Sequence, residues 1–594
     1  LGEQFWPSGH NWSNFIHETY VQLQSHADPR QAGEKITAVL LKNFPQISPY
    51  LKRLYLQPLA DIHLDAEVTG SDAVLGDKKY VYLFSLVAGF VLLIACINFM
   101  NLATARSLQR AKEVGMRRVA GASRWQLVGQ FYGESILLAF IALFLALLLV
   151  ELFLPAFNQL SGKNLAMDYR DPRLVLGFTV IILATGLVAG SYPALYLSSF
   201  KPVKVLKGMM ESGTQGSRFR KALVVTQFSL SVILMIGAAV VYQQLEYMRN
   251  KKLGFEKENL VYVPAKENAG AKYEAFKNEL LQEPNIIGVT AQGSLPMFSV
   301  NSGTVSWEGK DPSIEQVMEN KAVDINFVEL MNLKILEGRN FSTAHPSDAK
   351  EAFIINEEAA RIMGMDSAVG KRITTAGRKG TIIGVVQNAH FKSLHHKIQP
   401  QFFYVLTNFT SEVMNLYGIV LIKIKSTDIP KTIAAIENVW KRVNPNTPFE
   451  YHFLDETIDR QYAAEKKISA MANYFTILAI AISCLGLFGL AAFAAERRTK
   501  EIGVRKVLGA TVTNIVSMLS QDFVKLVLVA NIIAWPVAYF AMNKWLQNFA
   551  YRIDLGWWVF VFAGGAALLI ALLTVSTQAL KAALANPVDS SRYE

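Results

Sequence analysis

Two short segments of the chain carry the same glutamate, glycines and basic residues in the same order. Residues 113–123 recur as residues 501–511, 388 positions further along. The matched residues are Glu113, Gly115, Arg117, Arg118 and Gly121 in the first segment and Glu501, Gly503, Arg505, Lys506 and Gly509 in the second. Acidic and basic side chains in such a cluster can bind a partner electrostatically. We interpret the two segments as equivalent contact points rather than as sites of acid–base chemistry.

Few residues elsewhere suggest chemistry. His390, His395 and His396 could bind a metal ion, but histidines without a nearby cysteine in a lysine-containing stretch are more often polar loop residues. Cys96 and Cys484 both lie inside apolar runs, which leaves no cysteine-based zinc site for the soluble parts. The chain has no G-x-x-x-x-G-K-S/T phosphate loop and no recognisable catalytic motif. We therefore predict no catalytic residue, no metal site and no enzymatic activity of the chain's own.

The composition is that of a membrane protein with a soluble part. Of the 594 residues, 51% are hydrophobic and only 18% are charged, which is too apolar for an ordinary soluble protein of this length. The net charge of +11 does not indicate nucleic-acid binding, because much of it lies in short loops beside apolar runs, where lysine and arginine set membrane topology. We predict a lipid bilayer and no nucleic acid as partners.

Seven apolar runs are long enough to cross a membrane as helices. They cover residues 81–100, 135–154, 174–197, 222–242, 475–495, 523–540 and 557–577. The loops 103–130, 198–221 and 496–522 are rich in lysine and arginine and are predicted to be cytoplasmic. Alternation then places residues 1–79 and 243–474 outside. The fold class is therefore membrane α-helical, with an extracytoplasmic domain that mixes strands and helices as an α+β fold.

The two contact segments belong to a longer internal repeat. At the same offset of 388, Cys96 matches Cys484 and Leu102 matches Leu490. After the third span of each set, residues 200–203 resemble residues 585–588. We predict six segments. They are 1–79, the C-terminal part of a first outer domain; 80–199, a first three-span domain; 200–221, a cytoplasmic linker; 222–242, a span; 243–469, a second outer domain; and 470–594, a second three-span domain. The repeat predicts a parent chain of eight spans and two outer domains, of which this chain lacks the N-terminal part.

Each contact segment is predicted to be part of a helical hairpin. Residues 103–124 favour a helix that continues the preceding span, and Gly121 and Ala122 break it. Ser123 and Gln126 then have the spacing of a capping box for the next helix, and Thr511 is a suitable N-cap in the second copy. In the outer parts, we expect a strand near residues 20–24 followed by a helix, strands at 260–264 and 380–386, and helices at 273–281, 356–363 and 428–443.

The repeated pattern E-x-G-x-x-K/R-x-x-G-A-S/T, placed after one span and before two more, resembles the FtsX-like permease domain. This domain is shared by MacB-type and LolC/LolE-type ABC transporter permeases, and the outer domain between the spans resembles the family's periplasmic core domain. The resemblance covers nearly the whole chain. It implies the multi-pass permease subunit of a bacterial inner-membrane ABC system, in which the ten matched residues dock a cytoplasmic ABC ATPase.

The same resemblance implies a mechanism. A separate ATPase, in two copies, would use ATP and Mg²⁺ and drive the outer domains by mechanotransmission, while the chain itself binds no cofactor. The work would be export or extraction of an antimicrobial peptide, a macrolide-like compound or a lipoprotein, with a periplasmic adaptor and an outer-membrane channel as further partners. An alternative is an FtsX-like signalling scaffold that activates a periplasmic hydrolase or senses peptide antibiotics.

Overall fold

A computed structural model describes residues 20–43, 53–62, 78–107, 111–198, 214–265, 272–295, 301–311, 316–365, 367–375, 378–407 and 418–584. The chain divides into two compact units, Leu1–Leu93 and Ile94–Glu594. The predicted match between residues 200–203 and 585–588 lies outside the described residues. Each unit is described by itself below.

The first unit contains α2 (Pro29–Asn43), α3 (Leu59–Ile62) and the start of α4 (Lys78–Ser107). The predicted helix after residue 28 is confirmed, and its Thr37 hydroxyl accepts a hydrogen bond from the Leu54 amide at 2.9 Å. The strand predicted at residues 20–24 is wrong, because this stretch is irregular. A strand needs a hydrogen-bonded neighbour, and the described residues of this unit supply none.

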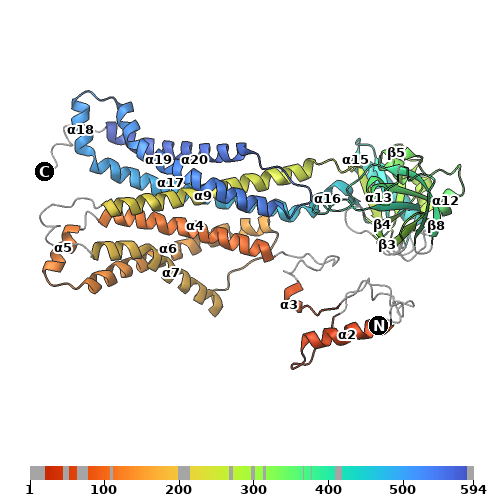
Figure 1. Cartoon of the computed structure of the whole chain (residues 1–594), viewed down its shortest axis with the longest axis horizontal. Coiled ribbons are helices and arrows are strands. Elements are labelled where there is room, and N and C mark those ends of the chain that lie inside the picture. The colour runs from red at the N-terminus through yellow and green to blue at the C-terminus, as the bar shows by residue number, and fades with distance from the viewer. Residues whose placement is uncertain are drawn as a thin grey trace. The chain divides into compact units, whose positions relative to one another are not determined.

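Seven helices are long and apolar enough to span a membrane among the residues described, and each predicted span lies within one of them. Besides α4 they are α6 (Arg124–Ser161), α7 (Pro172–Ser198), α9 (Thr214–Asn250), α17 (Ala463–Arg497), α19 (Val512–Leu546) and α20 (Trp557–Leu584). The predicted membrane fold is therefore confirmed. Figure 1 shows α9, α17, α19 and α20 running side by side, and each of them contacts the other three.

The core of this four-helix group is built around α9. Its buried side chains recur every fourth residue, which places Val224, Phe228, Val232, Ile236 and Val240 on one stripe. The facing stripe of α19 is made of small residues, and they let the two helices approach closely. It consists of Val527, Ala530, Ala534 and Ala538.

The outer domain lies between α9 and α17 in the sequence and is built on one eleven-stranded sheet. Its strands are β1 (Leu260–Pro264), β2 (Ile286–Gln292), β3 (Asn301–Trp307), β4 (Gln316–Val323), β5 (Ile335–Gly338), β6 (Ala352–Asn356), β7 (Arg372–Thr375), β8 (Arg378–Val386), β9 (Gln401–Val405), β10 (Ile419–Ile424) and β11 (His452–Phe453). Its helices are α10 (Tyr273–Leu280), α11 (Phe327–Leu330), α12 (Asp348–Glu351), α13 (Glu357–Met363), α15 (Ile429–Val443) and α16 (Leu454–Gln461). The predicted strands and helices of this domain are confirmed, and so is its α+β class.

The sheet forms two lobes. In one, β11, β1, β10 and β2 pair antiparallel, and the amphipathic α15 packs Ile433, Ile436 and Trp440 against them together with α10. In the other, β4, β3, β7, β8, β6 and β9 close into a ring, because β9 pairs in parallel with β4. A single register pair, Gln292 with Val323, connects the lobes along the sheet.

Candidate docking hairpins and outer junction

Each predicted contact segment folds as a short helix and a tight turn. The helices are α5 (Ala111–Val119) and α18 (Thr499–Val507). They end in the same way, because Gly121 and Gly509 take left-handed backbone conformations with φ of 97° and 90°. The amide of Ala122 bonds the Arg117 carbonyl at 3.0 Å, and the amide of Ala510 bonds the Arg505 carbonyl at 2.9 Å. Both turns are therefore Schellman-type caps.

The next helix starts on a side-chain cap in both copies. Ser123 caps α6 and accepts from the Gln126 amide, while the Gln126 side chain accepts from the Ser123 amide. This confirms the predicted capping box. Thr511 caps α19 by accepting from the Asn514 amide at 3.3 Å. In the second copy the preceding span does not continue unbroken into the hairpin, because α17 ends at Arg497 and α18 is a separate helix that begins at Thr499. In the first copy the residues that join α4 to α5 lie outside the described residues, so the continuation expected there stays a prediction.

A single buried aliphatic residue anchors each hairpin to its bundle. Val114 of α5 packs against Leu127, Phe131 and Ala194. Ile502 of α18 occupies the matching position in a cluster with Ala495, Ile515, Leu519, Ala579 and Ala583. In both copies the anchor therefore joins the start of the second span to the end of the third. A force on α5 or α18 acts directly on these helix ends.

The predicted acidic and basic residues form one ion pair on each hairpin. Arg117 pairs with Glu113 and Arg505 pairs with Glu501, each at 2.7 Å across one turn of helix. Exposed pairs of this kind add only about 0.3–0.5 kcal/mol to stability, so they do little to hold the fold. Arg117 also donates to Gln130 at 2.8 Å, and Gln130 donates to Glu134 at 3.0 Å. In the second copy, Arg498 pairs with Asp522 at 3.3 Å.

The two basic residues of each segment do not lie alike. Arg117 and Arg505 are exposed, whereas Arg118 and Lys506 are half-buried. Gly503 is half-buried on α18, and Gly115 lies within α5. The structure thus brings Glu113 together with Arg117, and Glu501 with Arg505, and assigns Gly121 and Gly509 to the turns.

The sequence reasoning missed the apolar side chains on the outward face of each hairpin. Val507 and Leu508 are 78% and 80% exposed, and Val119 is 65% exposed. Met116 and Val504 are exposed at matching positions. The helical period could have found them, because residues two and five positions after the anchors Val114 and Ile502 lie on the opposite face. Apolar side chains beside an ion pair are typical of a protein-binding surface.

The predicted histidines lie at the other end of the second repeat, where the outer domain meets the loop between α19 and α20. His390 packs edge-on against Tyr551 with ring centres 4.6 Å apart, and His395 lies 4.8 Å from Phe549. Burial and the nearby Lys251 ammonium lower the pKa of His390 to about 4. These histidines are therefore packed rather than solvated loop residues, which corrects the expectation for His390 and His395. Among the residues that could be searched, no group of three side chains is placed to hold a metal.

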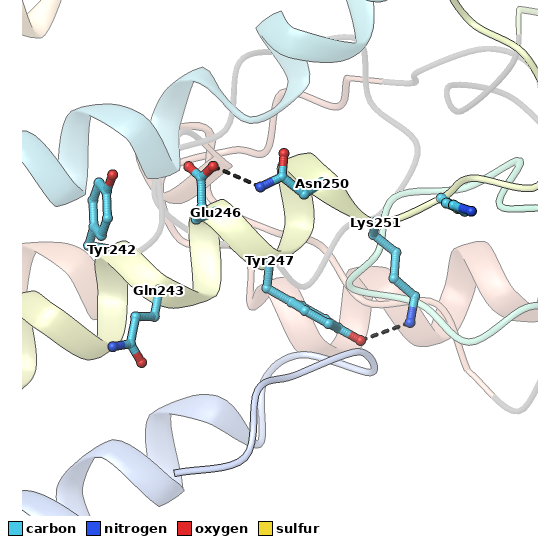
Figure 2. Close-up of a pocket in the computed structure, with 7 residues that line it drawn as sticks. Tyr242, Gln243, Glu246, Tyr247, Asn250 and Lys251 are labelled. Atoms are coloured by element: carbon cyan, nitrogen blue, oxygen red, sulfur yellow. Dashed lines mark hydrogen bonds between the residues drawn. The ribbon is translucent and has the colours of Figure 1, made fainter. Parts of the chain in front are cut away.

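The same junction reaches the outer end of α9. Gln244 donates to the Tyr551 carbonyl at 2.9 Å and accepts from the Ile553 amide at 2.9 Å. The outer end of α9 and the two lysines that follow it line an open hollow of about 570 Å³. The lining residues are Tyr242, Gln243, Glu246, Tyr247, Asn250, Lys251 and Lys252. Figure 2 shows Glu246 bonded to Asn250 on one side of the helix and Tyr247 bonded to Lys251 on the other.

Comparison with known proteins agrees with the duplicated hairpins. The FtsX-like permease C-terminal family matches residues 85–202 and 473–587, and the MacB-like periplasmic core domain matches residues 222–439. The macrolide export ATP-binding/permease protein MacB of Rhodopirellula baltica is 25% identical over 194 residues, which are 32% of this chain and 26% of that protein. The uncharacterized ABC transporter permease YknZ of Bacillus subtilis is 23% identical over 350 residues, 56% of this chain and 85% of that one.

Among solved structures, the periplasmic region of MacB from Actinobacillus actinomycetemcomitans aligns with 36% of this chain and 96% of that one, at 14% identity and a TM-score of 0.27. The matched domains are those of a membrane component of an ABC transporter. The chain belongs to the FtsX-like permeases with a MacB-like periplasmic core domain, and it is a multi-pass membrane protein. It spans about a quarter of the length of the Rhodopirellula relative.

Proposed function

We propose that this chain is the transmembrane permease subunit of an ABC system, and that a separate cytoplasmic ATPase docks on α5 and α18. The observation that supports this most is the duplication of the hairpin in its details. Both copies share the buried anchor, the outward ion pair, the exposed apolar residues and the glycine turn. A segment that only set membrane topology would need the basic residues and none of the rest.

Two hairpins in one chain call for two copies of the ATPase, one on each. ATP and Mg²⁺ would be bound by those ATPase subunits. The docking surface includes the predicted residues Glu113, Gly115, Arg117, Arg118 and Gly121, with Glu501, Gly503, Arg505, Lys506 and Gly509 in the second copy. We add Met116 and Val119 in the first hairpin, and Val504, Val507 and Leu508 in the second. Burial of the apolar residues against the ATPase would contribute binding free energy, and the ion pairs would fix the orientation of the ATPase on the hairpin.

Movement at the hairpins would reach the outer domain through the long helices. Ile502 links α18 to α19 and α20, and the loop between these two helices is held by Gln244, His390 and His395 at the outer end. The outer domain would then do mechanical work on a substrate outside the inner membrane. Given the macrolide exporters among its relatives, an amphipathic compound, an antimicrobial peptide or a lipoprotein is the proposed substrate, with a periplasmic adaptor and an outer-membrane channel as further partners.

The test is charge reversal at both exposed arginines, R117E with R505E, in the full-length chain. We expect the double variant to insert in the membrane normally but to lose the ABC ATPase that co-purifies with the unaltered chain. The loss should exceed tenfold, because each hairpin would present two neighbouring carboxylates to its partner. Full retention of the ATPase would overturn the assignment.

Two further variants separate docking from hairpin stability. Exchange of the partners, E113R/R117E with E501R/R505E, keeps both ion pairs within the helix and reverses their polarity. If the partner reads the charges, the exchange also loses the ATPase; if the pairs only stabilise the helices, it binds as the unaltered chain does. V507D/L508D tests the apolar part, and L584D, at an exposed leucine at the end of α20, is its control for the presence of a new carboxylate.

A further inference from the structure

The contact between the two repeats is asymmetric at two positions. Residues 94–102 of α4 match residues 482–490 of α17 at the offset of 388. Ile94, Cys96 and Leu102 are identical to Ile482, Cys484 and Leu490. Ala95 corresponds to Ser483, and at two further positions an asparagine corresponds to a glycine: Asn98 and Asn101 in the first repeat match Gly486 and Gly489 in the second.

These matched stretches pack against each other. A Cβ atom built on Gly486 would lie 2.5 Å from Oδ1 of Asn98, so the asparagine side chain fills the space that the missing side chain leaves. Gly489 is filled in the same way by the side chain of Leu102. Asn98 and Gly486 are therefore equivalent positions of the two repeats that touch each other. A second link joins the repeats nearer the outer side, where the Lys467 ammonium donates to the Ser161 carbonyl at 2.7 Å.

The surroundings of this contact are polar for the centre of a membrane bundle. Gln227 of α9 donates to the Ser483 carbonyl at 3.3 Å, and the Ser231 and Ser483 hydroxyls bond at 2.8 Å. Asn101 is wholly buried on α4. Burying an amide in an apolar interior costs about 1–3 kcal/mol unless it is hydrogen-bonded. The stability of the helix bundle therefore depends strongly on which residues lie opposite these asparagines. A buried asparagine is also the side chain that most often fixes register and partner choice between helices.

We propose that this contact is a lock that pairs the first repeat of a chain with the second repeat, rather than with the first repeat of another copy. Asn98 fills the space at Gly486, and Leu102 fills the space at Gly489, where the first repeat carries Asn101. Asparagine opposite asparagine would place two amides in the space of one. Glycine opposite glycine would leave a void and lose the contacts that hold the helices close. Only the mixed pairing fills the space. The inference does not depend on the ATPase docking proposed above, because it concerns the membrane bundle alone.

The test uses three variants of the full-length chain in detergent. The all-glycine form is N98G/N101G, the all-asparagine form is G486N/G489N, and the exchanged form carries all four changes. Each double variant should lower the melting temperature, and the exchanged form should recover more than half of the loss of the all-asparagine form. An exchanged form that loses as much as the two double variants added together would overturn the proposal. G565N is the matched control, since it puts an asparagine on α20 where a new Cβ meets no atom within 4 Å.

Partner choice is tested by co-expressing two copies with different affinity tags. An all-glycine chain and an all-asparagine chain cannot form the mixed contact internally, but each supplies what the other lacks. We expect this combination to be captured together at least threefold more than two unaltered chains, or than two chains of either double variant. Equal capture in all four combinations would show that the four residues do not select the partner.

Discussion

The two permease repeats have nearly the same helices but very different surroundings in the described residues. In the second repeat, α9 covers the small-residue stripe of α19, and Ala530 and Ala534 are fully buried. The equivalent residues of α6, Ala142 and Ala146, are exposed. The second repeat is also tied to the outer domain through the loop between α19 and α20. The comparison teaches that the repeats share the design of their hairpins, and that the small-residue stripe on the second span of each repeat is a surface on which another helix can pack.

The two hairpins share an anchor, a tip and a helix cap, but the residues that form these features differ in size and in hydrogen bonding. Ile502 replaces the smaller Val114 as anchor, and Leu508 replaces the smaller Ala120 at the tip. The first hairpin has the more complete helix cap, because Gln126 returns a hydrogen bond to Ser123. If the two hairpins bind identical ATPases, we expect the second hairpin to contribute more binding free energy than the first. We expect the first hairpin to be stabilised more by its own helix cap.

The largest effect is expected from removing the anchors. I502A should destabilise the docking of α18 by about 2–4 kcal/mol, because a buried isoleucine loses its contacts and leaves a cavity. V114A removes less and should cost about half as much. Hydrogen exchange of the α18 and α5 amides measures both, as a rate increase of roughly tenfold per 1.4 kcal/mol. Equal acceleration in the two hairpins would contradict the difference drawn between them.

A pH effect is expected at the outer end of the second repeat. The pKa of His390 is lowered to about 4, below its ordinary value of 6.5, so the folded junction binds fewer protons than the unfolded chain between these values. The contribution of neutral His390 to the free energy of unfolding is fully present above pH 6.5 and is lost as the pH falls towards 4, by at most about 3 kcal/mol.

The measurement is the melting temperature of the unaltered chain and of H390F at pH 7, 5.5 and 4. The difference between the two proteins should change in favour of H390F as the pH falls, because phenylalanine keeps the ring contact with Tyr551 and cannot bind a proton. A difference that stays constant with pH would show that the pKa of His390 is the same in the folded and in the unfolded chain.

The smallest effect is expected at the helix caps. The double variant S123A/Q126A should cost about 1–1.5 kcal/mol in the first turn of α6, because together the two changes remove both hydrogen bonds of the capping box. T511A removes one cap hydrogen bond and should cost about 1 kcal/mol in α19. Hydrogen exchange in the first turns of the two helices provides the measurement. A larger effect of T511A would reverse the order of local stability proposed for the two hairpins.

Much of the fold could be predicted from local patterns. The spans follow from long apolar runs, and Gly121, Ser123 and Thr511 marked helix ends by residue type and spacing. The ion pairs follow from matched charges in two copies. All these signals depend on neighbours within a few residues, which a single sequence contains.

The features that were missed depend on distant partners. The strand expected at residues 20–24 has the right alternation, yet a strand also needs hydrogen-bonded neighbours. Strand β10 lies between two partner strands, and the first unit supplies no such pair in the described residues. The packing of His390 against Tyr551 joins residues 161 positions apart. The facing of Asn98 and Gly486 could not be foreseen either, because the repeat shows that two positions are equivalent but not that they touch.

Helix α9 of the second repeat is one long, continuous helix that leads from the membrane bundle to the outer domain. It runs for 37 residues without a proline, which is about 55 Å of continuous helix, whereas α6 and α19 each contain one, Pro155 and Pro536. A rod of this length that tilts by about 10° at one end sweeps its other end through roughly 10 Å. That is the thickness of one packed layer of a protein sheet. A modest rocking of the bundle would therefore displace the attached outer domain by a distance large enough to open or close a contact surface.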